Sequence, residues 1–334
     1  MSTNHNPTVV IADHDFGDVD IERAIICGAG FDLVAANCKS EDDVIAAAAD
    51  ADAVITQYAE VGKAAIDHFN HCRVIARYGI GVDIVDVDEA TRREILVTNV
   101  PNDWCSNEVA DHAVALLLAL VRKLPQYAAA TRSGEWQWQS GQPIQRMQQA
   151  TLGLLSFGSI AQGIAERMKG FGVRIIASDP YADPKEAAAR GVSLVPFERL
   201  LSDSDYLVIQ APLTDETRGL FDESVLRRMK RGAILVNTAR GPIVKDQALY
   251  QVLKDGWLGG AGLDDIEEEP AKRANWKPTN PLFSLDNVII TPHAAYYSVQ
   301  SIETVRRFAS EEVVRVLRGE APLSPVNKVK ALAH

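Results

Sequence analysis

Residues 152–161 read Leu152-Gly153-Leu154-Leu155-Ser156-Phe157-Gly158-Ser159-Ile160-Ala161. The apolar run up to Phe157 predicts a buried strand, and Gly158 opens a helical pattern. A strand, a tight turn and a helix in this order direct the unpaired N–H groups of the helix at a pyrophosphate. Read as G-x-G-x-x-G/A, the motif has Ser156 at its first position, Gly158 at its second and Ala161 at its third. On its own the turn is weak evidence, since a strand–helix turn without a ligand is about as common.

A carboxylate at the end of the next predicted strand strengthens this interpretation. Asp179 follows the turn by about 20 residues, where an acidic side chain can accept hydrogen bonds from both hydroxyls of an adenosine ribose. The same charge would repel a 2′-phosphate, so we expect the cofactor to be NAD rather than NADP. The alternative, that Asp179-Pro180 only begins a turn, leaves its distance from the glycine turn unexplained.

Short β-branched runs alternate with helical patterns along almost the whole chain. In the second part, the predicted strands are 152–157, 174–179, 192–195, 206–211, 233–238, 260–265 and 288–292. In the first part they are 8–13, 32–37, 53–57, 74–79 and 96–100, with helices at 41–51, 61–69 and 85–93. Strands joined by helical crossovers form parallel sheets covered on both faces. The predicted fold class is therefore α/β, with a doubly wound parallel sheet in the second part.

A long helix is predicted between the two parts, over residues 107–124. Ser106 or Asn107 is its expected cap, and Pro125 prevents its continuation. Because this helix is apolar nearly all round, it should be packed on several sides, as a linker or subunit-contact helix would be.

Two other segments stand out. Residues 133–142 look like an ordered loop, and its tryptophans, Trp136 and Trp138, need a surface to pack on. The tail is one amphipathic helix over 301–318, ending at Gly319.

Size and charge limit what the chain can be. Its 334 residues exceed what one hydrophobic core usually supports, which predicts two domains. The formal net charge of -11 opposes binding to nucleic acid or to an anionic membrane surface. The longest apolar run, 109–121, is broken by Asp111 and His112 and is shorter than the roughly 20 residues of a membrane-spanning helix. The polar segment 1–7 does not have the pattern of a secretory signal, so we expect a cytoplasmic location.

The cysteines are widely separated and form no C-x-x-C motif; they are Cys27, Cys38, Cys72 and Cys105. This spacing opposes both a zinc site and a disulfide framework, so we expect no metal. The cysteines are interpreted as small hydrophobic residues in or near the cores.

Two side chains follow predicted strands at the edge where ligands of doubly wound sheets bind. Arg240 lies just after strand 233–238, where its guanidinium can hold a carboxylate and polarise the adjacent carbonyl. His293 follows strand 288–292 and is the only one of the seven histidines just past a strand of the second sheet. Oxidation of a 2-hydroxy acid requires such a cation and such an acid/base beside a nicotinamide. A surface arginine and a structural histidine are the alternatives, and the strand-end positions favour the functional interpretation.

An acidic run, Glu267 to Glu269, follows strand 260–265. Such a run is usually a solvated loop, and we expect that of two of its three residues. The third, hydrogen-bonded to the imidazole of His293, would fix its tautomer and keep it protonated for ketone reduction. The spacing leaves open which of the three has this role.

Taken together, these motifs resemble those of the D-isomer-specific 2-hydroxyacid dehydrogenases. The likeness, in order and spacing, covers Val236 to Gly241, Gly262-Leu263-Asp264 with Glu268-Glu269-Pro270, Thr291 to Ala295, Arg77 to Asp83, and Asn99-Val100-Pro101. It extends over nearly the whole chain. The run His293 to Ser298 and the helix start at Glu108 to Asp111 are most similar to the branch that contains the C-terminal-binding-protein corepressors and their bacterial relatives.

The resemblance implies an NAD-dependent enzyme that interconverts a small 2-oxo acid and its D-2-hydroxy acid. It implies that Arg240 is catalytic, that His293 donates the proton, and that Glu269 supports His293. The substrate-binding residues it implies are Arg77, Gly79, Ile80, Gly81, Tyr58 and Tyr296. The expected cofactor-binding residues are Ser156, Gly158, Ser159, Ile160, Asp179, Val109, Ala211, Pro212, Thr217, Thr238, Ala239, Asp264 and His293.

The fold of the family implies a discontinuous, flavodoxin-like substrate domain over residues 1–103 and 300–334. Residues 104–299 would form a Rossmann nucleotide domain. Catalysis would occur in the cleft between them, aided by closure about hinges near Pro101 and Ser298. A homodimer through the nucleotide domain is also implied.

Three positions depart from the pattern of the family. Ser156 replaces the first glycine of the fingerprint and Ser159 stands where an arginine is frequent, which would weaken cofactor binding. Tyr296 takes the place of a pocket tryptophan in the corepressor branch. A different class of function therefore stays open, a dimeric NAD(H)-sensing binding protein with weak dehydrogenase activity. An oxidoreductase for a non-carbon substrate such as phosphite is a third candidate.

Overall fold

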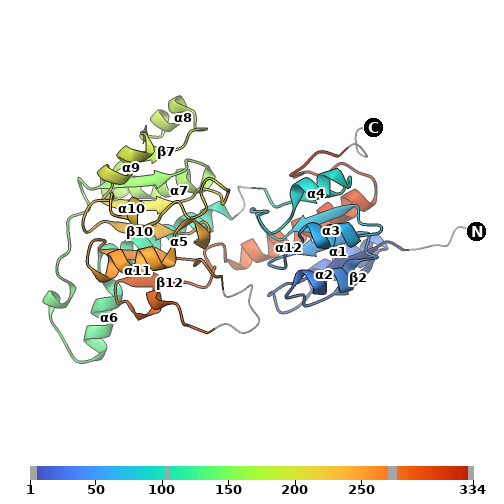
Figure 1. The fold of residues 1–334 in the computed structure, drawn as a ribbon, viewed down its shortest axis with the longest axis horizontal. Coiled ribbons are helices and arrows are strands. Elements are labelled where there is room, and N and C mark those ends of the chain that lie inside the picture. Colours follow the sequence, from blue (N-terminus) through green and yellow to red (C-terminus); the bar gives the residue numbers. More distant parts are fainter. Residues whose placement is uncertain (1–5, 102–104, 270–276, 330–334) are drawn as a thin grey trace, which may run out of the picture. The chain divides into compact units, whose positions relative to one another are not determined.

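The computed structural model describes residues 6–101, 105–269 and 277–329, which form two compact units (Figure 1). Unit one contains the described residues 6–101 and 298–329, and unit two contains 105–269 and 277–297. Both are α/β units built on a parallel sheet, which confirms the predicted fold class.

Unit one is built on a five-stranded sheet in the order β2-β1-β3-β4-β5, the order of flavodoxin-like sheets. Its strands are β1 (Thr8–Ile11), β2 (Asp32–Ala35), β3 (Ala53–Thr56), β4 (Val74–Arg77) and β5 (Leu96–Thr98). Its helices are α1 (Asp20–Ile26), α2 (Glu41–Ala48), α3 (Lys63–His68), α4 (Val87–Arg92) and α12 (Val299–Leu317).

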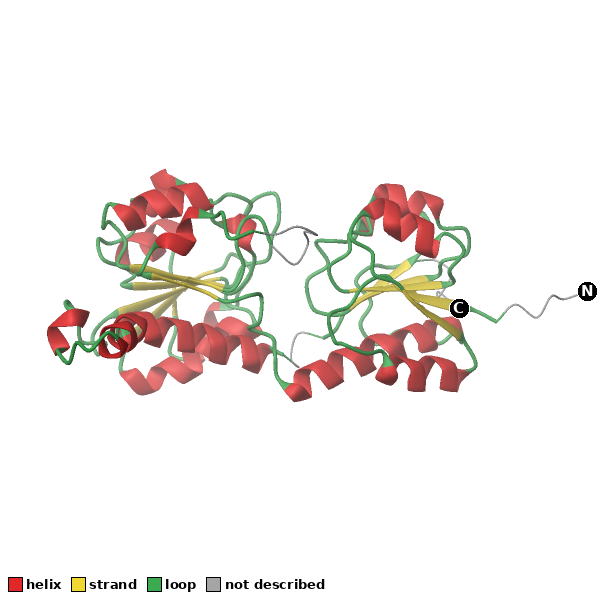
Figure 2. Ribbon diagram, turned by 90° about the horizontal axis from the view of Figure 1, so that it is seen from below, coloured by secondary structure: helices red, strands yellow, loops and turns green. Residues whose placement is uncertain are grey.

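Alternate strand residues of unit one face opposite cores. In β1, Val10 packs in the core beneath α2, α3 and α4, whereas Val9 and Ile11 pack in the core beneath α1 and α12. Successive side chains of a strand point to opposite faces, so a strand that is buried on both sides is a continuous apolar run. Figure 2 shows the two helical layers on either side of the sheet.

Unit two has a seven-stranded parallel sheet in the order β12-β11-β10-β9-β6-β7-β8. Its strands are β6 (Thr151–Leu155), β7 (Arg174–Ser178), β8 (Ser193–Leu194), β9 (Tyr206–Ile209), β10 (Ile234–Asn237), β11 (Gly260–Leu263) and β12 (Val288–Ile290). Its helices are α5 (Ser106–Val121), α6 (Leu124–Arg132), α7 (Ser159–Met168), α8 (Pro184–Ala189), α9 (Phe197–Asp203), α10 (Glu223–Leu226) and α11 (Asp246–Lys254).

The strand order of unit two reverses between β6 and β9, which are neighbours in the sheet. One core lies beneath α5 and α7, and the other beneath α9, α10 and α11. Ligands of such sheets bind at the reversal point, beyond the carboxyl ends of the strands. Short 3-10 helices occur at Cys27–Ala29, Trp138–Gly141, Lys169–Phe171, Gly241–Ile243 and Pro281–Ser284.

Every predicted strand is present, and each ends one or two residues before its predicted end. The residues at these ends leave the sheet to form the turns, as Ser156 and Phe157 do after β6. Helices α1 and α6 were not predicted, and α8, α9, α10 and α11 were expected only as crossovers without bounds. The tail helix begins two residues earlier than expected, because the Ser298 hydroxyl caps it by accepting the N–H of Ser301 at 2.9 Å.

The prediction for the long helix is wrong at both ends. Cys105 is the N-cap of α5 and makes no side-chain cap, while Ser106 is the first helical residue. At the other end α5 stops at Val121, and Lys123 has a φ of 55°. Pro125 then lies in the first turn of α6, where a missing N–H costs nothing, so it starts a second helix.

Within the described residues, no single helix has both the length and the apolarity to cross a membrane; only α5 and α6 together, bent by 59°, meet that measure.

Candidate active site

A buried carboxylate shapes the loop that carries His293. The backbone N–H of His293 donates to the carbonyl of Asp264 at 2.7 Å. The carboxylate of Asp264 accepts the N–H groups of Ala294 and Ala295 at 2.9 and 2.8 Å. These bonds hold His293 at a φ of 50°, which residues other than glycine rarely adopt. Asp264 is 2% exposed. It therefore shapes the loop of His293, and its expected role in binding the cofactor stays a prediction.

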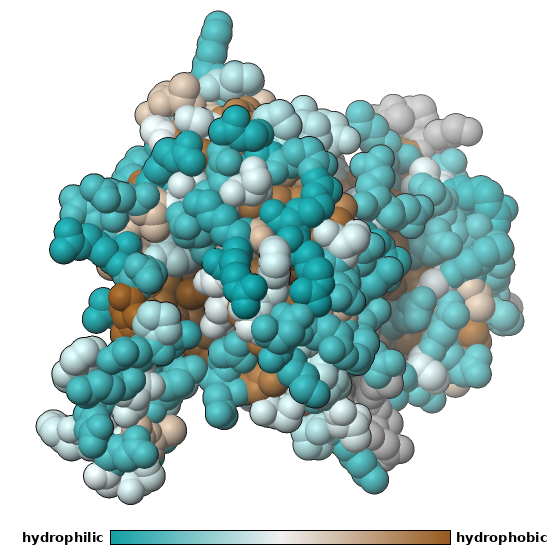
Figure 3. All heavy atoms as spheres, turned by 60° about the vertical axis from the view of Figure 1, so that its left-hand side comes forward, coloured by the Kyte–Doolittle hydropathy of each residue, from teal (hydrophilic) through white to brown (hydrophobic). Residues whose placement is uncertain are grey.

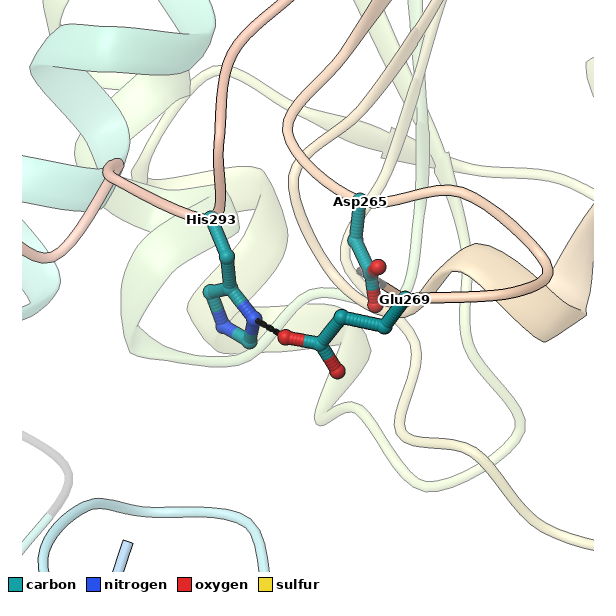
Figure 4. Close-up of side chains that lie close together, drawn as sticks. All are labelled: Asp265, Glu269 and His293. Carbon is teal, nitrogen blue, oxygen red and sulfur yellow. Dashed lines mark hydrogen bonds and ion pairs between the residues drawn. The ribbon is translucent and has the colours of Figure 1, made fainter. Parts of the chain in front are cut away.

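The imidazole of His293 is hydrogen-bonded through Nδ1 to Oε1 of Glu269 (Figure 4). Glu269 is buried, whereas Glu267 and Glu268 are exposed. The structure therefore pairs His293 with one of the three acidic residues that the spacing left open. A carboxylate on Nδ1 fixes the tautomer and makes Nε2 the nitrogen that can exchange a proton with a ligand.

A second buried carboxylate, that of Asp265, belongs to the same cluster. One side-chain atom from each of Asp265, Glu269 and His293 lies within 4.8 Å of those of the other two. Asp265 accepts the N–H of Gly241 at 3.0 Å and that of Ile266 at 2.8 Å. A histidine with two carboxylates can bind a divalent cation. Here both carboxylates have partners within the chain, and the expectation of no metal stays a prediction.

Arg240 lies on a well-fixed turn after β10. Asn237, the last residue of that strand, donates through Nδ2 to the Arg240 carbonyl at 2.9 Å and accepts the N–H of Ala239 at 3.0 Å. The next residue, Gly241, has no room for a side chain, because a Cβ there would collide with the backbone of Ile266. The turn that carries the half-buried Arg240 is thus in backbone contact with the segment leading to Glu269.

The turn after β6 fits the phosphates of a dinucleotide. Ser156, at the first fingerprint position, has a φ of 78°, which is the left-handed conformation that favours glycine. Gly158 is the N-cap of the ten-residue helix α7 and, as a glycine, gives that helix no side-chain cap. A Cβ built on Gly158 would meet no atom within 4 Å. An uncapped helix N-terminus beside open space is suited to an anionic group.

Asp179, expected to bind ribose, is oriented by this same turn. Its Oδ2 accepts the N–H of Phe157 at 2.8 Å and the hydroxyl of Ser156 at 3.2 Å, and its Oδ1 accepts the N–H of Tyr181 at 2.8 Å. A carboxylate has about four acceptor sites, so Asp179 keeps capacity for a ribose hydroxyl. Unit two therefore has groups suited to NAD at the start of α7, beside Gly158, and just after β7, at Asp179.

The other expected cofactor residues follow the carboxyl ends of the same sheet or begin its helices. The hydroxyl of Ser159 lies 3.0 Å from that of Ser106, which joins the N-termini of α7 and α5. The hydroxyl of Thr217 donates to the carbonyl of Pro212 at 2.7 Å. The remaining members are Val109 on α5, Ile160 on α7, Ala211 after β9, and Thr238 and Ala239 after β10.

In unit one, the predicted carboxylate-binding loop follows β4. Gly79 has a φ of 149°, and a Cβ there would collide with the guanidinium of Arg77. The carbonyl of Ile80 accepts the side-chain N–H of Asn99 at 2.7 Å. Among the described residues, the N–H groups of Ile80 and Gly81 have no hydrogen-bond partner. Two adjacent N–H groups of this kind are suited to an anionic ligand.

The two predicted pocket tyrosines lie in different units. In unit one, Asp13 accepts the backbone N–H of Tyr58 at 2.8 Å, so the loop after β3 is anchored to the end of β1. In unit two, the ring of Tyr296 meets the ring of His293 edge-on at 6.0 Å.

Asp246, the first residue of α11, is hydrogen-bonded to the acidic segment Glu267 to Glu269. Its carboxylate accepts the side-chain N–H of Asn280 at 2.6 Å and the backbone N–H of Glu267 at 3.1 Å. Its own N–H donates to the Glu267 carboxylate at 3.2 Å. Burial raises the pKa of Asp246 to about 6. The segment that leads to Glu269 is therefore held by a carboxyl that loses its proton near pH 6.

Sequence reasoning missed two polar side chains near His293, namely Asp265 and His112. His112, on α5, hydrogen-bonds the Thr291 hydroxyl at 2.9 Å and lies 3.6 Å from the Asp264 carboxylate. The sequence showed His112 only as a break in an apolar run. A polar residue on a buried helix needs a partner, and that rule is the signal that could have found it.

Large parts of this chain are similar to known proteins. Residues 114–295 match the family described as "D-isomer specific 2-hydroxyacid dehydrogenase, NAD binding domain". A glyoxylate reductase of Pyrococcus furiosus is 39% identical over 289 residues, covering 84% of this chain and 83% of that protein. One of Korarchaeum cryptofilum is 40% identical over 259 residues, covering 77% of this chain and 76% of that protein. The solved NAD complex of an NAD-dependent formate dehydrogenase of Staphylococcus aureus has a TM-score of 0.85 at 27% identity, over 97% of this chain and 99% of that one.

Proposed function

This chain belongs to the family of D-isomer-specific 2-hydroxyacid dehydrogenases, and we propose on that premise that it reduces a small 2-oxo acid at a centre formed by His293, Glu269 and Arg240. It is an NAD-dependent enzyme that interconverts 2-oxo acids and 2-hydroxy acids. The observation that carries the residue assignment is the hydrogen bond between His293 and Glu269, because a proton donor at neutral pH needs such support.

NADH, when bound, supplies the hydride that reduces C2 of the 2-oxo acid. The N–H groups at the start of α7, beside Gly158, are suited to hold its pyrophosphate. The Asp179 carboxylate is suited to a free ribose diol and opposes a 2′-phosphate.

His293 gives a proton from Nε2 to the carbonyl oxygen of the substrate, and in the reverse direction Nε2 takes it back. Glu269 holds the imidazole through Nδ1 and its negative charge favours the protonated ring. The guanidinium of Arg240 holds the substrate carboxylate and polarises the adjacent carbonyl.

We assign substrate binding to unit one and nucleotide binding to unit two. The N–H groups of Ile80 and Gly81, with Arg77 beside Gly79, are the expected contacts of the substrate carboxylate. Tyr58 and Tyr296 are the expected contacts of the substrate side chain.

A spectrophotometric assay of NADH oxidation tests the activity. Glyoxylate is the first substrate to try, because the relatives above are named for it; hydroxypyruvate, phenylpyruvate, branched and sulfonated 2-oxo acids complete the panel. Reduction of glyoxylate creates no stereocentre, so the D configuration has to be read from the product of phenylpyruvate or hydroxypyruvate. No turnover with any of these acids would remove the proposal.

The same assay tests the residue assignment. His293→Ala should lower turnover by about 10²- to 10⁴-fold, because a positioned acid/base contributes that much. Its affinity for NADH should stay near that of the wild type. His71→Ala, which changes an exposed histidine of unit one, is the matched control. Undiminished turnover in His293→Ala would show that another group donates the proton.

We also propose that the chain forms a homodimer through α6 and the loop that follows it. Three large apolar side chains of this segment are exposed, with Leu124 at 54%, Trp136 at 90% and Trp138 at 69%. Figure 3 shows apolar (brown) area on the face of unit two that contains this segment. A second copy of the same surface would bury it. Light scattering should give the mass of a dimer for the wild type, and Trp136→Ser/Trp138→Ser should shift the population toward monomer.

An NAD(H)-sensing protein of the corepressor type would use the same dimer. It would show slow turnover with every 2-oxo acid, together with dimerisation that depends on the nucleotide. The relatives named above are reductases, which favours the enzyme.

A further inference from the structure

In unit two, Asp265 lies close both to the pair His293 and Glu269 and to the turn that carries Arg240. It follows Asp264 directly after β11, but the two carboxylates have different partners. Asp264 binds the 291–295 loop, whereas Asp265 lies with Glu269 and His293, within 4.8 Å. Figure 4 shows these three side chains converging from the segment after β11 and the loop after β12. Asp265 is 6% exposed, so its charge is poorly screened by water.

The same carboxylate reaches the turn of Arg240. Its Oδ2 accepts the N–H of Gly241 at 3.0 Å, while its Oδ1 accepts the N–H of Ile266 at 2.8 Å. Gly241 is already in backbone contact with Ile266, where a Cβ would not fit. Movement of Asp265 would therefore displace the residue that follows Arg240.

The charges around the imidazole are predominantly negative. Within the part of the chain that the structure describes, charged or titratable groups come from four surrounding segments: Asp264, Asp265, Glu267, Glu268 and Glu269 after β11, His112 on α5, Arg240 after β10, and Tyr296 and Tyr297 on the same loop as His293. Asp264 accepts three donors of the 291–295 loop, which disperses its charge. Glu269 and Asp265 are thus the nearest carboxylates, and an opposite charge at such a distance favours the protonated ring.

We propose that Asp265 is a positioning residue for 2-oxo acid reduction, which fixes the Arg240 turn through Gly241 and places a second negative charge beside His293. Asp265 itself exchanges no proton: the proton leaves Nε2 of His293 for the carbonyl oxygen as the hydride reaches C2. Since His293 has to be the proton donor, this role of Asp265 rests on the proposed function.

Asp265→Asn removes the charge and keeps one oxygen that can accept the Gly241 N–H, although its amide NH2 group then replaces the acceptor of the Ile266 N–H. Reduction of the 2-oxo acid requires the protonated ring, and the loss of a neighbouring negative charge should make its activity fall at lower pH than in the wild type. Oxidation of the 2-hydroxy acid requires the neutral ring, so its activity should rise at lower pH than in the wild type. General structural damage would lower both directions at every pH.

Asp265→Ala and Asp265→Glu separate the two functions of the side chain. Alanine removes the acceptor of the Gly241 N–H as well, and the KM of the 2-oxo acid should rise about tenfold because the Arg240 turn loses a charged hydrogen bond. Glutamate restores the charge, and its pH profiles should return toward those of the wild type even if turnover is lower. Glu268→Gln is the matched control, since it removes one exposed negative charge from the same segment. NADH binding, followed by fluorescence, reports whether each variant is folded.

Three results would overturn this role. The first is a pair of Asp265→Asn profiles that coincide with those of the wild type, and the second is an equal loss in both directions at all pH values. The third is an unchanged KM in Asp265→Ala, which would remove the anchoring of the Arg240 turn. If His293→Ala lowers turnover while Asp265→Asn leaves the profiles in place, the role of Asp265 fails and the proposed function stands. If His293→Ala keeps full turnover, both fail.

Discussion

The imidazole of His293 is hydrogen-bonded to the carboxylate of Glu269, 24 residues earlier in the chain. The two residues follow β12 and β11, which are neighbours at one side of the unit two sheet. Parallel strands bring their carboxyl ends to a single edge, so groups that are distant in sequence meet there. The buried Asp264 completes the arrangement by holding the backbone on which His293 lies.

Glu269→Gln should lower the turnover of 2-oxo acid reduction by about 10- to 100-fold at neutral pH. Glutamine keeps an acceptor for Nδ1 of His293 but loses the charge that favours the protonated ring. The loss should therefore be larger at pH 8 than at pH 6, and steady-state kinetics at the two values would measure it. The KM of NADH should stay unchanged. Equal turnover in the variant and the wild type at both pH values would exclude Glu269 as the support of His293.

The conformation of Ser156 predicts the order of stability of the wild type and two variants. Its left-handed φ of 78° strains any residue with a Cβ, and its hydroxyl donates to Asp179 at 3.2 Å. Ser156→Ala keeps the strain and loses the bond, so it should lower the free energy of unfolding by about 1 kcal/mol. Ser156→Gly relieves the strain and should stay within about 0.5 kcal/mol of the wild type. Urea denaturation measures the three values, and an alanine variant as stable as the glycine variant would contradict this account.

The strands could be predicted from the sequence because each is an apolar run between polar turns, a pattern that depends little on distant contacts. Helix α1 could not. It has seven residues, and its Glu22 is fully buried. The burial of Glu22 depends on an ion pair with Arg306, 284 residues away. From the neighbouring sequence alone, a glutamate is predicted to lie on the surface. The local pattern of apolar and polar residues therefore does not predict this helix.

The same distinction applies to the candidate site. Arg240 and His293 directly follow apolar strands, and strand position alone predicts the edge on which they lie. The choice of Glu269 among three consecutive glutamates depends on the loop conformation after β11, which spacing does not determine. Asp264 and Asp265 are adjacent in sequence, yet one shapes the His293 loop and the other binds the Arg240 turn. That division follows from their hydrogen bonds and is invisible in the residue types.

Arg306→Met should strongly destabilise unit one. Nε and Nη2 of Arg306 bond the Glu22 carboxylate at 2.9 and 2.7 Å, and the hydroxyl of Tyr78 donates to it at 3.1 Å. Without the guanidinium, a fully buried carboxylate has no countercharge, which typically costs about 3–5 kcal/mol. Urea denaturation followed by far-UV circular dichroism should show this loss.

A double variant separates the buried charge from the lost packing of Arg306. Arg306→Met/Glu22→Leu removes both charges, so it should be more stable than Arg306→Met alone. Arg307→Met is the control, because Arg307 pairs with Glu303 on the exposed side of the same helix and should contribute only about 0–1 kcal/mol. A double variant no more stable than the single one would mean that the packing of the arginine stem, and not the buried charge, is what the helix needs.

The raised pKa of Asp246 makes the stability of unit two depend on pH. Burial raises this pKa to about 6 from the ordinary 3.8. The folded chain therefore binds this proton more tightly than the unfolded chain does. The contribution to stability is fully present below about pH 4 and is lost as the pH rises through about 6. A shift of about two pH units corresponds to roughly 3 kcal/mol.

Asp246→Asn removes the ionisation and keeps an oxygen for the N–H groups of Asn280 and Glu267. Relative to the wild type, its free energy of unfolding should therefore increase by about 1–3 kcal/mol between pH 4 and pH 8. Urea denaturation at both pH values would measure the difference, with the exposed Asp286→Asn as the control for the loss of one negative charge. A difference between Asp246→Asn and the wild type that is equal at pH 4 and pH 8 would mean that folding does not raise the proton affinity of Asp246. The link between the acidic segment and α11 would then be an ordinary ionised contact, with no change in strength near neutral pH.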